Sequence, residues 1–148
     1  TGACPAGGAP QWSYLSSNAY ARFVKGVAAR LRLVNGDTVL NVAEGCAESA
    51  DVLQQLYRNR LQLYELHGTP QELVRTARAR AARLAALAVT PTTPPPPVNA
   101  CVAAPSALGW LPNEAFDAAV SFGGLSTLRS RRQACAAFQS LLRAVRPG

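Results

Sequence analysis

The chain has 148 residues, 49% of them hydrophobic, a size and composition that favour one globular domain with its own core over a disordered chain. Its formal net charge is +7, from 15 Lys and Arg against 8 Asp and Glu, so its charge favours acidic proteins, nucleic acid or an anionic membrane surface as partners. No apolar run approaches the roughly 20 residues that a spanning helix needs, so we expect no transmembrane segment.

The missing methionine and the spacing of the cysteines bear on the processing of the chain and on its cellular compartment. The sequence contains no methionine, which favours a processed chain or a fragment. Residues 1–13 do not have the composition of a targeting peptide and are expected to form a flexible arm or an extended segment that docks on a partner. No two cysteines form a CxxC pair, which favours free thiols in a reducing, intracellular compartment; we expect the mitochondrial matrix. The cysteines are Cys4, Cys46, Cys101 and Cys135.

The first predicted elements are a helix and a strand. Apolar residues recur at helical spacing through residues 14–33, with basic residues between them, which predicts an amphipathic helix. The Asn35-Gly36-Asp37 turn leads into a β-branched and apolar strand at 38–42. Small residues at 43–47 and a helix at 48–57 follow. This layout is typical of a nucleotide-binding βα unit, although one glycine between two alanines also fits a tight turn in any α/β protein.

A second strand and helix follow the 48–57 helix. Residues 61–66 predict the strand, which ends at Glu65. Thr69, Pro70 and Glu72 have the spacing of a capping box with proline at the first helical position. They predict the start of a helix that continues to about residue 88.

The last part of the chain contains a connector, two strands and a helix. Residues 90–97 are proline-rich and predict an extended connector. Strands are expected at 98–102 and 116–122, separated by a loop that Trp110 and Leu111 anchor. A second capping box at Ser130 and Gln133 opens a helix, which the Pro147-Gly148 pair ends. Its predicted apolar stripe consists of Ala134, Phe138, Leu141, Leu142 and Val145.

These elements alternate along the chain, and most of the strands are apolar throughout. Both features predict an α/β fold with a parallel sheet covered by helices on both faces. Right-handed crossovers order the strands 3-2-1-4 and place a ligand crevice between the first and fourth strands.

Several segments together resemble the class I S-adenosylmethionine-dependent methyltransferases, and within them the small type 11 branch with its quinone C-methyltransferases. The resemblance covers residues 14–148. The segment NGDTVLNVAEG is similar to the family's first strand and glycine-rich turn, and LYELHGTPQELVRTAR to its second strand and helix. The segment WLPNEAFDAAVSFGGLSTL is similar to its fourth-strand motif, and AAFQSLLRAVRPG to the helix and turn before strand 5.

Carried over residue by residue, the resemblance implies a degenerate cofactor site. Where the family has an acid followed by Gly-x-Gly-x-Gly, this chain has Asn41, Ala43, Gly45 and Ala47, so only the middle glycine remains. The resemblance implies that Glu65 grips the ribose diol and that Ser121, in the Ser121-Phe122-Gly123 rim, lines the cofactor. A strand-end acid such as Glu65 could equally form a surface pair with Arg60.

The chain departs from the family in two further ways. The acid that follows strand 3 in the family is replaced by residues 103–106, which read AAPS. The family also continues into strands 5, 6 and 7, so we expect either further sequence or a protein partner that covers the edge of the fourth strand.

The remaining candidate residues give little support for catalysis. His67, the only histidine, is predicted to be a solvated loop residue, and Asp117 to be structural. Arg129, Arg131 and Arg132 gather at a helix start, where cations are unfavourable, and predict a site for an acidic partner or phosphate. Arg75, Arg78 and Arg83 are expected to point away from the line formed by Leu73, Ala77 and Leu84.

Three functions remain open. The first is a non-catalytic structural or interaction subunit of a larger assembly, with no cofactor and no metal. The second is an active S-adenosylmethionine-dependent methyltransferase that acts on a small molecule or quinone. The third is an RNA- or ribosome-associated factor, whose binding would weaken steeply with salt.

Overall fold

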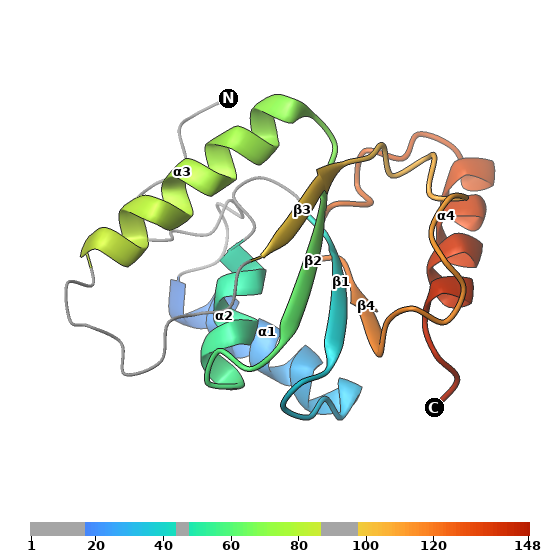
Figure 1. The fold of residues 1–148 in the computed structure, drawn as a ribbon. Helices are drawn as coiled ribbons and strands as arrows, with labels where there is room; N and C mark the ends of the chain where they lie inside the picture. Colours follow the sequence, from blue (N-terminus) through green and yellow to red (C-terminus); the bar gives the residue numbers. More distant parts are fainter. Residues whose placement is uncertain (1–16, 44–47, 87–97) are drawn as a thin grey trace.

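The fold is built on a parallel sheet whose four strands lie in the order β3-β2-β1-β4 (Figure 1). The computed structural model describes residues 17–43, 48–86 and 98–148. The elements are α1 (Ser17–Leu31), β1 (Thr38–Val42), α2 (Glu48–Leu56), β2 (Gln62–His67), α3 (Pro70–Ala86), β3 (Asn99–Val102), β4 (Ala118–Val120) and α4 (Arg131–Ala144). The predicted α/β class and strand order are confirmed. The predicted arm at 1–13 and the connector at 90–97 lie outside the described residues.

Helices cover both faces of the sheet, as the apolar strands predicted. On one face, Val39 and Leu63 pack with residues of α1 and α2. On the other face, Leu40 and Leu66 pack with α4 and with the loop before β4. α3 contacts β2 and β3 and lies on the same side as α1 and α2 (Figure 1). The side chains of β1 therefore alternate between two separate apolar clusters.

The limits of three strands are affected by contacts between residues that lie far apart in the sequence. β2 ends at His67 rather than near Glu65. β4 has only three residues; before it, the Asp117 N–H still donates to the Thr38 carbonyl oxygen of β1 at 2.8 Å, and Phe116 forms an isolated parallel bridge with Val145 on the other side. β3 is exposed along its whole length, since it lies at the edge of the sheet. Residues 144–146 thus begin to cover the outer side of the β4 segment.

The side chains predicted to cap α3 and α4 do so. The Thr69 hydroxyl accepts a hydrogen bond from the Glu72 N–H at 3.2 Å. The Ser130 hydroxyl accepts from the Gln133 N–H at 3.1 Å, and the Gln133 side chain accepts in return from the Arg129 N–H at 3.0 Å. These bonds satisfy N–H groups that have no partner inside the helix.

Several predicted burial patterns are wrong. Leu111 is buried as expected, but Trp110 is 57% exposed and Leu108 takes the buried place beside Leu111. On α3, Ala77 is exposed, and Thr76 and Ala79 face the sheet instead. On α4 the buried residues are Ala137, Leu141 and Ala144, whereas Phe138 and Leu142 face solvent. The predicted stripe was displaced because Ala137 and Ala144 allow the helix to lie close to the sheet.

Candidate functional site

The connections of the sheet diverge at the carboxyl ends of β1 and β4. The chain passes from β1 to α2 on one face and from β4 to α4 on the other (Figure 1). In an open parallel sheet, such a divergence marks the crevice where ligands bind. This is where the sequence predicted the cofactor site. The predicted site residues Gly45 and Ala47 lie outside the described residues.

The loop after β4 lies directly against the end of β1. The Ser121 hydroxyl donates a hydrogen bond to the Val42 carbonyl oxygen at 3.2 Å. A Cβ atom added at Gly124 would lie 2.1 Å from that same oxygen and 2.9 Å from the Ala43 oxygen. Only glycine fits at position 124, because a side chain there would collide with backbone. Ser121 and Gly124 therefore hold the loop after β4 against the carboxyl end of β1, where a ligand crevice is expected.

Asn41 lies inside the sheet, on β1. Its exposed fraction is 0%, and among the residues that the structure describes neither its Oδ1 nor its Nδ2 atom has a hydrogen-bond partner. Leaving a buried polar group unpaired costs about 1–3 kcal/mol. The amide is therefore an unfavourable feature of the core unless a ligand or a conformational change supplies a partner.

Ala43 follows β1 and is buried. Its N–H donates to the Leu66 carbonyl oxygen at 2.9 Å, which extends the pairing of β1 with β2 beyond the last strand residue. The backbone at position 43 is thus held by β2, and the Cβ atom of Ala43 lies within the protein.

Glu65 is buried in the middle of the sheet, opposite Asn41 in the register of β1 and β2. Its side chain is 0% exposed and forms an ion pair with Arg80 of α3, at 2.6 Å between Oε1 and Nη2. Its Oε2 atom lies 3.0 Å from His67 Nε2. Arg80 also binds Asp51 of α2 at 2.9 Å. Glu65 therefore joins β2 to α3, and the predicted alternative of a surface pair with Arg60 is wrong.

This network sets the ionisation of Glu65. Burial alone would raise the pKa of the Glu65 carboxyl, but the hydrogen bond with His67 and the charge of Arg80 outweigh it and hold the pKa below its ordinary value. The pKa of Arg80 is raised, because the negative charge of Glu65 outweighs the cost of burying the guanidinium. Glu65 is therefore an ionised carboxylate whose two oxygens both have partners.

His67 is not the solvated loop residue that the sequence predicted. It is the last residue of β2, and 1% of it is exposed. Its backbone carbonyl accepts from the Ala103 N–H at 2.8 Å, which ties the end of β2 to the end of β3. The last residue of β2 is therefore a buried histidine that contacts Glu65.

Sequence reasoning missed Arg80 and Asp51, which complete this network. Arg80 follows the buried Thr76 by one helical turn, so both lie on the face of α3 that is turned to the sheet. An arginine on a buried helix face requires a buried or half-buried acid. The position of Arg80 on that face could therefore have indicated an acidic partner.

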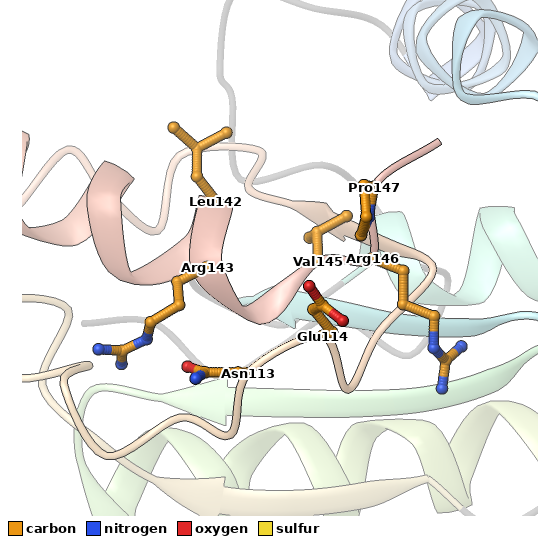
Figure 2. A pocket seen from close by; sticks show the side chains of 7 residues that line it. All are labelled: Asn113, Glu114, Leu142, Arg143, Val145, Arg146 and Pro147. Carbon is orange, nitrogen blue, oxygen red and sulfur yellow. The ribbon is translucent and has the colours of Figure 1, made fainter.

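The predicted basic cluster lies at the start of α4. Arg129, Arg131 and Arg132 are all exposed there, where α4 begins at the same edge of the sheet as the crevice (Figure 1). A pocket of about 430 Å³ lies at the other end of α4, between the residues that precede β4 and the chain after the helix. Figure 2 shows Arg143 and Arg146 on either side of Glu114 in this pocket.

The described residues contain neither a membrane-spanning helix nor a cluster of metal-ligating side chains. Of the helices described, none has both the length and the apolar character that crossing a membrane requires. Among the residues at 17–43, 48–86 and 98–148, no cluster of three or more His, Cys, Asp or Glu side chains could hold a metal ion. Cys101 and Cys135 are free and exposed.

Comparison with known proteins finds similarity in structure only. No protein-family model and no curated protein matches the sequence. A putative sarcosine dimethylglycine methyltransferase from Galdieria sulphuraria matches with a TM-score of 0.66 and 14% identity, over 89% of this chain and 44% of that one. The chain has the class I methyltransferase fold.

Two further structures have the same fold. An arsenic(III) S-adenosylmethionine methyltransferase from Chlamydomonas reinhardtii matches with a TM-score of 0.60 and 18% identity, over 78% of this chain and 37% of that one. A putative methyltransferase from Haloferax volcanii, solved in complex with the activator Trm112, matches with a TM-score of 0.58 and 20% identity, over 84% and 47%. The chain thus spans less than half the length of these proteins. At such identities the likeness concerns the fold alone.

Proposed function

We propose that this chain is a degenerate methyltransferase-fold domain that acts as a non-catalytic interaction subunit of a larger assembly. The observation that carries the proposal is that the Glu65 carboxylate is fully engaged by other side chains of the protein. Both oxygens of this carboxylate are bound by Arg80 and His67 inside the protein, so neither is available to a ribose diol. Asn41, Ala43 and the residues after β3 supply no other carboxylate at the described positions.

We therefore expect that the S-adenosylmethionine site no longer binds the cofactor. Asn41 stands where the family that the sequence resembles has an acid, and its neutral amide lacks the negative charge that would attract the cationic end of the cofactor. The cofactor would supply a methyl group when bound. Ser121 and Gly124 would still hold the loop after β4 against the end of β1 beside it.

Titration calorimetry of the purified chain with S-adenosylmethionine and with its demethylated product tests the proposal. We expect no binding at micromolar ligand concentration by a chain whose circular dichroism and cooperative unfolding show that it is folded. Binding with a micromolar Kd would overturn the proposal.

An active methyltransferase is the second candidate, and one observation favours it. The amide of Asn41 is fully buried and has no hydrogen-bond partner among the described residues, as expected of a group that binds a ligand. The substitution Asn41→Leu separates the two functions. If the site no longer binds the cofactor, the substitution stabilises the chain by about 1–2 kcal/mol, because an unpaired polar group is replaced by an apolar one. If the site binds the cofactor, Asn41→Leu abolishes the calorimetric signal that the unsubstituted chain gives.

A further inference from the structure

The helix α4 carries two large apolar side chains on a flank that does not face the sheet. Phe138 is 56% exposed and Leu142 is 75% exposed. They lie one helical turn apart, so their side chains are neighbours about 6 Å apart. We refer to this pair as the α4 ridge. Single exposed apolar residues are ordinary on protein surfaces, but adjacent ones that continue into a pocket indicate a binding surface.

The α4 ridge continues into the pocket at the end of the helix. Leu142 belongs to both, and Val145 and Pro147 extend the apolar surface into the pocket (Figure 2). The volume of about 430 Å³ is within the range of pockets that take up ligand groups. The pocket lies beside the bridge between Phe116 and Val145, at the amino end of β4, and is thus separate from the crevice at the carboxyl ends of the strands.

We propose that the α4 ridge and this pocket dock an amphipathic helix of an acidic partner protein. The inference rests on the proposed function, since an interaction subunit needs a docking surface. A ridge that follows a helix axis is complemented by a second helix whose side chains pack into the adjoining grooves. An apolar anchor from that helix would fill the pocket beyond Leu142.

The charges around the surface specify an acidic partner. Arg131 and Arg132 are exposed at the first turn of α4, and Arg143 and Arg146 line the pocket at its other end. Glu114 is the one acid among the residues that line the pocket. Two copies of a chain with a net charge of +7 repel each other, whereas an acidic partner gains complementarity at the Arg131 and Arg132 end of the ridge. At the pocket end, Arg146 is already paired with Asp117 at 2.6 Å, so that end contributes mainly its apolar surface.

A labelled synthetic peptide tests the proposal on the full chain. The probe is an amphipathic helix of about 18 residues with Leu at i, i+3, i+4 and i+7 and Glu at the flanking positions. Fluorescence anisotropy should show saturable binding that Leu142→Asp weakens at least tenfold. The double substitution of Arg131 and Arg132 by Glu should weaken it several-fold. The control Val74→Asp, at a position on α3 that is 45% exposed, should leave the affinity unchanged.

Four results would overturn the proposal. The first is equal binding of a peptide with Lys in place of Glu, and the second is binding that Leu142→Asp does not change. The third is a dimer in sedimentation that Leu142→Asp dissociates, which would make a second copy the occupant. The fourth is displacement of the peptide by single-stranded RNA, which would make the surface a nucleic-acid site.

The results distinguish a failure of the docking surface from a failure of the proposed function. Micromolar binding of S-adenosylmethionine would overturn the non-catalytic role and leave a positive peptide result standing. Failure of the peptide to bind a chain that also binds no cofactor would overturn the docking surface alone.

Discussion

Glu65 stabilises the fold of this chain, although an acid near the end of the second strand would be expected to bind a ligand. An acid close to the end of the second strand in a methyltransferase fold predicts a ligand contact. In this chain the acid lies two residues before the end of β2, and its carboxylate joins the sheet to α3 through Arg80. The same residue type at nearly the same place thus serves packing.

Removing this carboxylate should strongly destabilise the chain. Glu65→Gln leaves Arg80, whose side chain is 18% exposed, without its closest counter-charge. Breaking a buried ion pair in this way costs about 3 kcal/mol. The control Glu114→Gln, at an exposed position, should change the free energy of unfolding by less than about 0.5 kcal/mol. Urea unfolding of both variants measures the difference, and equal midpoints would contradict the assignment of Glu65 to the fold.

The same carboxylate predicts the effect of acid on stability. The pKa of Glu65 is lower in the folded chain than its ordinary value of 4.5, so its stabilising contribution is fully present above that value. The contribution is lost as the pH falls below about 4.5 and through the folded pKa. Urea unfolding between pH 3 and pH 7 should therefore show a fall in stability below about pH 4.5 that is smaller in Glu65→Gln. Parallel curves for the two proteins would show that other groups cause the acid sensitivity.

Gly124 provides a second prediction at the scale of the residue. Gly124→Ala places a Cβ atom 2.1 Å from the Val42 oxygen, and the backbone must move to relieve the overlap, at a cost of about 2 kcal/mol or more. Gly26→Ala is the control, because Gly26 lies within α1 with nothing within 4 Å of the added atom. It should stabilise the chain by about 0.5–1 kcal/mol. Thermal unfolding should shift in opposite directions for the two variants, and a shift in the same direction would contradict the close approach of the loop to β1.

At the scale of elements, the sequence predicted those features that depend on neighbouring residues. The starts of α3 and α4 were located correctly because capping uses residues three apart. The length of β4 was overestimated because only residues 118–120 pair in register with β1, which an apolar run alone does not reveal. Likewise, the apolar stripe of α4 depends on which small residues meet the sheet, and spacing alone does not reveal that.

The cap of α4 can be tested separately from its packing. Ser130→Ala removes the side-chain oxygen that accepts from the Gln133 N–H and should destabilise the chain by about 1 kcal/mol. Ser130→Asp supplies another acceptor at the helix start and should restore most of that loss. The midpoints of urea unfolding compare the three proteins. A Ser130→Ala variant as stable as the unsubstituted chain would show that the cap contributes nothing.

At the scale of the molecule, the order of the strands could be predicted from the connectivity of the chain. The side-chain contacts of the candidate site could not. Alternating elements and right-handed crossovers restrict the topology, and the sheet has the predicted order. The site depends on contacts between distant elements, such as those of Asp51, Glu65 and Arg80, which come from α2, β2 and α3. Asn41 was identified from the sequence, but only the structure shows that its amide is buried with no hydrogen-bond partner in the part of the chain that is described.

The stability of the sheet should be uneven from its centre to its β3 edge. Leu40 and Val42 of β1 are each 1% exposed, and β1 pairs with a strand on either side. By contrast, all four residues of β3 are exposed, and β3 pairs with β2 alone among the described strands. We therefore expect amide protons of β1 to exchange only on global unfolding, and those of β3 through local opening at rates at least about 100-fold higher. Native-state hydrogen exchange measures both. Equal protection would mean that β3 opens only together with the central strands, and the sheet would then unfold as one cooperative unit.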